Sequence, residues 1–176
     1  PWTPAVHDYL KWLSQSGLGG IPHVGGIDED GREIVSYIEG RSVPVDDEIV
    51  LDNVLVEAVT WLRDFHDIAD SYQPDGPQVW RQSAGEPVEL AAGEGICHND
   101  PGAYNWIIQS GHFVAMIDWD LAGPGRPIDD LAFLCWTAIP LYRPIEPAEA
   151  ARRIDLVVDA YAEFGPMALL DAIVER

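Results

Sequence analysis

Apolar residues recur at helical spacing near both ends of the chain and along one central stretch. Near the start, Val6, Leu10 and Leu13 fall on one face of a predicted helix over residues 4–16. A broader apolar face predicts a second helix over residues 46–70, and its members are Ile49, Leu51, Val54, Leu55, Ala58, Val59, Leu62 and Phe65. Three more helices are predicted over residues 128–139, 147–164 and 167–175, so helices dominate the second half.

Extended segments are shorter and form two predicted hairpins. Residues 21–27 and 32–38 flank the turn signal Asp-Glu-Asp-Gly. A second hairpin starts at Trp106, turns at residues 109–111 and returns toward Asp118. Residues 39–44 are predicted to be a connector, and residues 71–95 an exposed loop with one short helix. This order predicts an α+β fold rather than a repeating βαβ sheet.

Composition and charge narrow the choice of partners. Hydrophobic residues make up 47 % of the 176 residues, enough to bury a core. The formal charge of −20 disfavours nucleic acid and anionic membrane surfaces and favours metal ions or amine-bearing small molecules. Cys97 and Cys135 lie in apolar stretches, which predicts two reduced, buried thiols in a cytoplasmic protein.

Polar residues gather around the second predicted hairpin. Because a hairpin brings its two ends together, we expect Asn105 to lie beside Asp118, with Asp100 on the loop that leads to the same end. One amide oxygen and one carboxylate form a hard-oxygen pair that suits Mg²⁺. A further carboxylate, from Asp100, can orient or deprotonate a hydroxyl. The pattern indicates metal-assisted phosphoryl transfer to an alcohol, and the competing interpretation is a polar turn without catalytic chemistry.

The segment His-Asn-Asp-Pro-Gly-Ala-Tyr-Asn at residues 98–105, followed by Ile-Asp-Trp-Asp at residues 117–120, resembles the catalytic and metal-binding segments of the aminoglycoside phosphotransferase family. That family shares the protein-kinase-like fold. The resemblance implies that Asp100 is the catalytic base, that His98 belongs to the catalytic group as an orienter of the loop, and that Asn105 and Asp118 are Mg²⁺ ligands. The step from Asp100 to Asn105 equals the spacing in protein-kinase catalytic loops. Residues 123–132 are similar to the family's Gly-Pro…Asp-Leu-Ala stretch, which buttresses the site.

Residues 34–40 resemble the last strand of the family's N-terminal lobe and its hinge. The resemblance implies that backbone groups of Ser36, Tyr37 and Ile38 pair with the adenine of ATP or another nucleoside triphosphate. We therefore expect a kinase-like fold with an incomplete N-terminal lobe, a helix plus hairpin, in residues 1–40. A helical catalytic lobe, expected to be truncated, would occupy residues 41–176.

The family's Gly-rich loop and strand lysine have no counterpart in the sequence. The single lysine, Lys11, lies on the first predicted helix. We expect the missing phosphate-binding parts to lower nucleotide affinity, because positioning supplies most of the rate in phosphoryl transfer.

The sequence thus predicts a Mg²⁺-dependent kinase that moves the γ-phosphate of ATP to a small, cationic acceptor such as an aminoglycoside or amino alcohol. This class of activity is associated with antibiotic resistance. The alternatives are a non-catalytic binding or immunity-type protein, an inactive fragment, or a phosphohydrolase with Asp100 as nucleophile. An exposed sheet edge beside residues 21–38 suggests a homodimer. The sequence leaves the roles of two residues undecided. Trp80 has either an acceptor-site or a surface role, and Asp120 is either a supporting acid or a loop cap.

Overall fold

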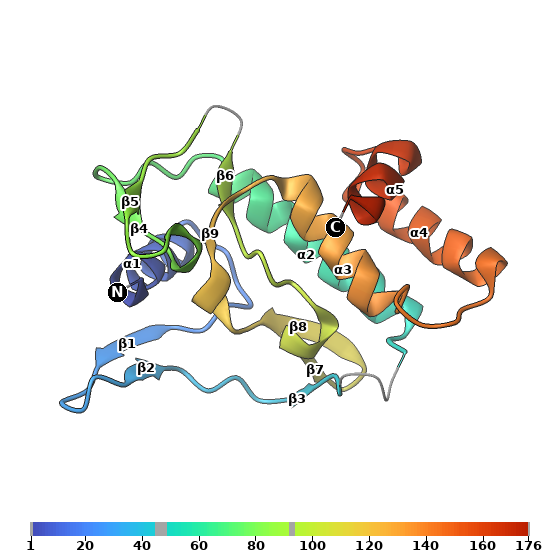
Figure 1. The fold of residues 1–176 in the computed structure, drawn as a ribbon. Coiled ribbons are helices and arrows are strands. Elements are labelled where there is room, and N and C mark those ends of the chain that lie inside the picture. Colours follow the sequence, from blue (N-terminus) through green and yellow to red (C-terminus); the bar gives the residue numbers. More distant parts are fainter. Residues whose placement is uncertain (1, 45–48, 92–93, 176) are drawn as a thin grey trace.

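The computed structural model describes residues 2–44, 49–91 and 94–175. Figure 1 shows a mixed fold of helices and short strands, in agreement with the predicted α+β class. One end of the molecule holds helix α1 (Thr3–Gln15) and the hairpin of β1 (Val24–Ile27) and β2 (Glu33–Val35). The other end is mainly helical.

Helix α1 and the first hairpin form as the sequence predicts. The helix buries Val6, Leu10 and Leu13, and the chain leaves it at Gly17, whose φ of +91° favours glycine. The residue that precedes the helix as its cap is Trp2. Strands β1 and β2 pair antiparallel, but each is shorter than predicted.

A three-stranded sheet connects the hairpin region to the rest of the molecule. Strand β3 (Arg41–Ser42) pairs with β7 (Trp106–Gln109), which pairs with β8 (His112–Met116), all antiparallel. The prediction of a plain connector over residues 39–44 is therefore wrong for β3. Gly40 enters this strand with a φ of +146°, and a methyl group there would lie 2.8 Å from the carbonyl oxygen of Ile108. The chain approaches β7 too closely for a larger residue.

The long helix α2 (Asp52–Ala69) begins later than predicted. Its apolar face packs against β8 and against α4 (Pro147–Tyr161). Ile49 and Leu51 precede the helix and are 52 % and 62 % exposed, so their assignment to the apolar face is wrong. The predicted start at residues 46–48 lies outside the described residues.

The last helices match the prediction to within a few residues. Helix α3 (Pro127–Ala138) packs against α5 (Pro166–Val174), and α4 contacts both α2 and α5. In each of these three helices a proline lies at the first or second position, where a backbone N–H would have no hydrogen-bond acceptor within the helix. None of the described helices is long and apolar enough to cross a membrane.

The segment over residues 71–95 is more ordered than a loop. Strands β4 (Gln78–Val79) and β5 (Pro87–Val88) flank the short helix η1 (Arg81–Ser83), and β6 (Gly95–Cys97) pairs with β9 (Gly123–Gly125). The short helix is confirmed, whereas both strand pairs were missed. These strands have two or three residues each, too few to show alternation.

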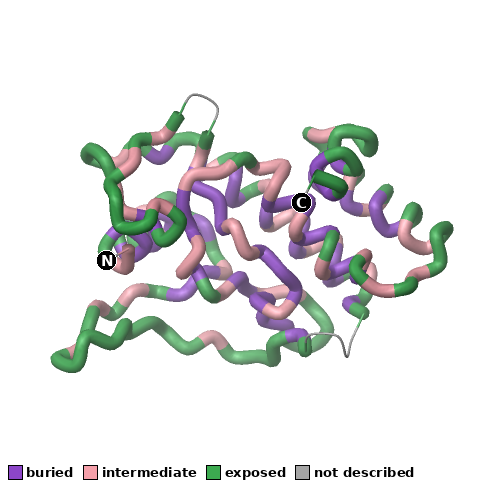
Figure 2. Tube along the Cα trace, viewed as in Figure 1, coloured by how far each residue is buried: buried purple, intermediate pink, exposed green. Residues whose placement is uncertain are grey.

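Aromatic residues fill the centre of the core, drawn in purple in Figure 2. The ring of Tyr9 lies 6.2 Å from that of Trp80 and 6.3 Å from that of Trp119. Trp80 is 2 % exposed, so the suggested surface or acceptor role for it is wrong. Both cysteines are free and buried, as predicted.

Candidate active site

The hairpin of β7 and β8 brings the predicted site residues together at one end. Trp106 pairs with Met116, and one step further the carbonyl oxygen of Asn105 accepts a hydrogen bond of 2.9 Å from the N–H of Ile117. Asp118 follows directly. The predicted neighbourhood of Asn105 and Asp118 is thus a result of strand register.

The loop before β7 turns back so that Asp100 meets Asn105. The short helix η2 (Ala103–Asn105) makes this turn. The Asn105 side-chain nitrogen donates to the Asp100 carbonyl oxygen at 2.9 Å and to its carboxylate Oδ2 at 3.1 Å. The Tyr104 hydroxyl donates to Oδ1 of the same carboxylate. Because both bonds use the amide nitrogen of Asn105, its amide oxygen is the atom left for a cation.

His98 ties the loop of Asp100 to the end of β8. The imidazole Nδ1 accepts a bond of 3.3 Å from the N–H of Asp100. The Nε2 therefore carries the hydrogen and donates it to the carbonyl oxygen of Ile117 at 3.1 Å. Complete burial lowers the pKa of His98, which the charge of Asp130 opposes, so the ring stays neutral. This geometry is that of a loop orienter.

The two acidic residues after β8 differ in how their charges are compensated. Asp118 has a left-handed backbone (φ 62°, ψ 66°), which aspartate tolerates better than most residues, and it is exposed. Within the described residues, its carboxylate has no hydrogen-bond or ion-pair partner. The Asp120 carboxylate, on the short helix η3 (Trp119–Leu121), accepts a bond of 3.0 Å from Arg81. Asp118 is therefore the carboxylate available to a cation.

A cavity of about 320 Å³ opens between the predicted hinge and the end of β8. Ser36, Tyr37 and Ile38 line one side of it, and Asp118 and Asp120 line another. Glu33 also lines the cavity, and the rest of its lining is apolar and includes Val6, Leu10 and Ile107. The hinge segment and Asp118 thus face one cavity, at the small end of the size range of ligand pockets.

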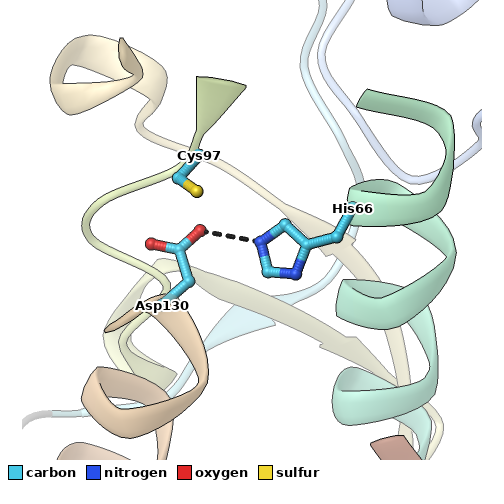
Figure 3. A group of neighbouring side chains, drawn as sticks. All are labelled: His66, Cys97 and Asp130. Carbon is cyan, nitrogen blue, oxygen red and sulfur yellow. Dashed lines mark hydrogen bonds and ion pairs between the residues drawn. The ribbon is translucent and has the colours of Figure 1, made fainter. Parts of the chain in front are cut away.

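A buried carboxylate, that of Asp130, holds the loop of Asp100 through hydrogen bonds to its backbone. Asp130 at the start of α3 is 1 % exposed. Its two oxygens accept the backbone N–H groups of His98 and Asn99, each at 2.8 Å. Nε2 of His66, on α2, lies 3.1 Å from Oδ2 of the same carboxylate, and Figure 3 shows this contact. The other ring nitrogen of His66 lies 2.7 Å from the hydroxyl of Tyr161 on α4.

Cys97 completes this group, and the ligand atoms of His66, Cys97 and Asp130 all lie within 4.8 Å of one another (Figure 3). Hydrogen bonds join His66 to Asp130 and to Tyr161, and the Cys97 thiol lies beside them. Both Asp130 oxygens already accept N–H groups, and burial together with the charge of Asp130 raises the pKa of Cys97, which keeps the thiol protonated. The sequence shows no link between His66 and Asp130, because they are far apart along the chain.

Residues 77–167 match the model of the phosphotransferase enzyme family, which is just over half of the chain. The chain belongs to this family. A curated relative, the trifolitoxin immunity protein of Rhizobium leguminosarum bv. trifolii, is 37 % identical over 150 residues. The match covers 81 % of this chain but 54 % of that protein, so the chain spans about half the length of this relative.

Solved kinases share the fold over nearly the whole chain. The amicoumacin kinase hAmiN, in complex with AMP-PNP and Ca²⁺, matches with a TM-score of 0.69 and 13 % identity, over 98 % of this chain and 68 % of its own. The aminoglycoside phosphotransferase APH(3'')-Id from Streptomyces rimosus, in complex with ADP and streptomycin, matches with a TM-score of 0.62 and 17 % identity, over 97 % and 81 %. The expected kinase-like fold is confirmed.

Proposed function

We propose that this protein is a Mg²⁺-dependent phosphotransferase that moves the γ-phosphate of ATP to a hydroxyl of a small acceptor. The observation that carries the proposal is the meeting of Asp100, Asn105 and the hinge-facing Asp118 at one end of the β7–β8 hairpin. The family supports a phosphotransferase in general, and the proposed residue roles are those that the resemblance of residues 98–105 and 117–120 implies.

The donor set fits a hard divalent cation. Asn105 offers its amide oxygen, and Asp118 offers a carboxylate that has no partner among the described residues. Mg²⁺ takes oxygen ligands of these kinds in proteins and usually keeps waters and substrate phosphates as further ligands. When bound, Mg²⁺ would offset negative charge on the phosphates. Residues 1–40 would hold the nucleotide through Ser36, Tyr37 and Ile38, and residues 41–176 would supply the catalytic groups.

The remaining chemistry belongs to Asp100. Its carboxylate would orient the acceptor hydroxyl and take its proton, while the acceptor oxygen bonds to the γ-phosphorus and the bond to the departing ADP breaks. His98 would keep Asp100 aligned through the bond to its N–H. The formal charge of −20 favours a cationic acceptor, and equal rates with an amine-bearing acceptor and a neutral sugar alcohol would contradict that preference.

The test is ADP formation from ATP in the presence of candidate acceptors, with Asp100→Asn as the variant. We expect kcat to fall by roughly a hundredfold or more, the typical contribution of a general base, with little change in nucleotide affinity. Asp129→Asn is the matched control, since Asp129 bonds Arg126 on the surface of α3. Equal rates for the two variants would refute the role of Asp100.

The immunity relative favours a second candidate function, a protein that protects its host by binding a toxin without transferring phosphate. The sequence contains one lysine, Lys11, and it lies beside Asp8 on α1 rather than at the hinge cavity. A ligand that binds equally well with and without Mg²⁺ and nucleotide would favour this candidate. Stimulation of ADP formation by the same ligand would favour the kinase, and then phosphorylation would be the means of protection.

A further inference from the structure

A second cavity, of about 280 Å³, lies between residues 103–104 of the Asp100 loop and helix α3. Four aromatic residues contribute to its walls: Tyr104, Phe133, Trp136 and Tyr142. The rest of its described lining is aliphatic apart from Thr137. It shares no described lining residue with the hinge cavity.

Tyr104 connects this cavity to the proposed catalytic base. Its ring forms part of the wall, and its hydroxyl donates to Oδ1 of Asp100. A hydroxyl therefore already occupies the carboxylate oxygen that an acceptor hydroxyl would use. An acceptor entering from this cavity would displace the Tyr104 hydroxyl and take over its bond to Asp100.

The described walls offer aromatic faces instead of charges or free polar groups. The Thr137 hydroxyl is engaged with the N–H of Ala103 at 3.3 Å and the carbonyl oxygen of Phe133 at 3.2 Å. Trp136 and Tyr142 are 38 % and 42 % exposed, with ring centres 6.2 Å apart and tilted by 43°. A polyhydroxylated amino sugar would leave many polar groups unpaired against such walls, whereas a flat apolar group would stack on them.

Resting on the proposed function, we propose that this aromatic cavity is the acceptor subsite and that it takes a hydroxyl carried on an aromatic or apolar body. The acceptor's amine, favoured by the net charge, would remain in solvent outside the cavity. Tyr104 would act as a specificity residue, since its ring shapes the cavity and its hydroxyl competes for Asp100.

Calorimetric titration of two amines, without nucleotide, tests this assignment. Tyramine has an aromatic body with a hydroxyl, and 2-deoxystreptamine has a polyhydroxylated ring, so both are cationic and differ in the body. We expect tyramine to bind at least tenfold more tightly. Trp136→Ala should weaken tyramine binding about fivefold or more through loss of ring stacking. Met167→Ala, at an exposed apolar position on α5, should leave it unchanged.

Tighter binding of 2-deoxystreptamine, no binding of tyramine, or equal tyramine affinity in wild type and Trp136→Ala would overturn the assignment. Tyr142→Leu replaces Trp136→Ala if that variant does not fold. A parallel titration with AMP-PNP and Mg²⁺ separates this inference from the proposed function. Nucleotide binding without tyramine binding overturns the subsite alone, and tyramine binding without nucleotide binding overturns the kinase assignment.

Discussion

Asp130 holds the loop of Asp100, and the stability that it contributes can be measured without any ligand. Its carboxylate accepts the N–H groups of His98 and Asn99 at 2.8 Å and faces Nε2 of His66 at 3.1 Å. In Asp130→Asn, one oxygen becomes an NH₂ group that cannot accept. His66 can adapt by exchanging its tautomer, but a peptide N–H cannot, so at least one buried donor faces another donor.

The expected cost follows from those contacts. An unsatisfied buried N–H costs about 1–3 kcal/mol, and losing the negative charge weakens the remaining bond, so we expect about 2–4 kcal/mol in total. With a urea m-value of about 2 kcal/mol/M, the unfolding midpoint should fall by roughly 1–2 M. Urea unfolding monitored by circular dichroism measures this shift.

Asp129→Asn is the control, because it removes the same charge from the adjacent residue. Asp129 bonds Arg126 at the surface, where an ion pair contributes roughly 0–1 kcal/mol. A midpoint shift of the same size in Asp129→Asn and Asp130→Asn would show that the contacts of Asp130 with the loop add no stability beyond that of a surface ion pair.

Two further predictions concern His98 and Gly40. Burial keeps the pKa of His98 below its usual 6.5, so the unfolded chain binds more protons than the folded chain near and below that pH, and the free energy of unfolding decreases as the pH is lowered. Between pH 7.5 and 5.5 this decrease should be up to about 1.4 kcal/mol larger in wild type than in His98→Asn, as measured by urea unfolding. Parallel pH profiles of the two proteins would contradict the prediction. Gly40→Ala places a methyl group against Ile107 and the Ile108 carbonyl at a φ of +146°, so we expect the free energy of unfolding to fall by about 2 kcal/mol or more in the same assay. Gly76→Ala is the control, because φ is also positive there but the space around the glycine is open. Equal losses in the two variants would show that crowding against β7 has no effect.

The sequence was informative where a pattern is local. Helix positions followed from apolar spacing, and the placement of Asn105 near Asp118 followed from the hairpin between them. The orienting role of His98 was implied by the family resemblance, and in the structure its ring bonds the Asp100 N–H and the Ile117 carbonyl oxygen.

Long-range pairings could not be predicted from the sequence. Strands β3, β6 and β9 are two or three residues long, and each forms because a distant partner satisfies its backbone groups. The link from His66 to Asp130 also joins separate helices. Trp80 was misjudged because its loop composition looked solvent-exposed, whereas tertiary packing against Tyr9 buries it.

Binding of AMP-PNP in the presence and absence of Mg²⁺ tests the proposed active site most directly. Asp118→Asn and Asp120→Asn form a matched pair, because both residues line the hinge cavity and, within the part of the chain that the structure describes, only the Asp120 carboxylate bonds an arginine. Our account predicts Mg²⁺-dependent binding that weakens about tenfold or more in Asp118→Asn and much less in Asp120→Asn. Binding that is independent of Mg²⁺, or equally weakened in both variants, would contradict the assignment of Asp118 as a metal ligand.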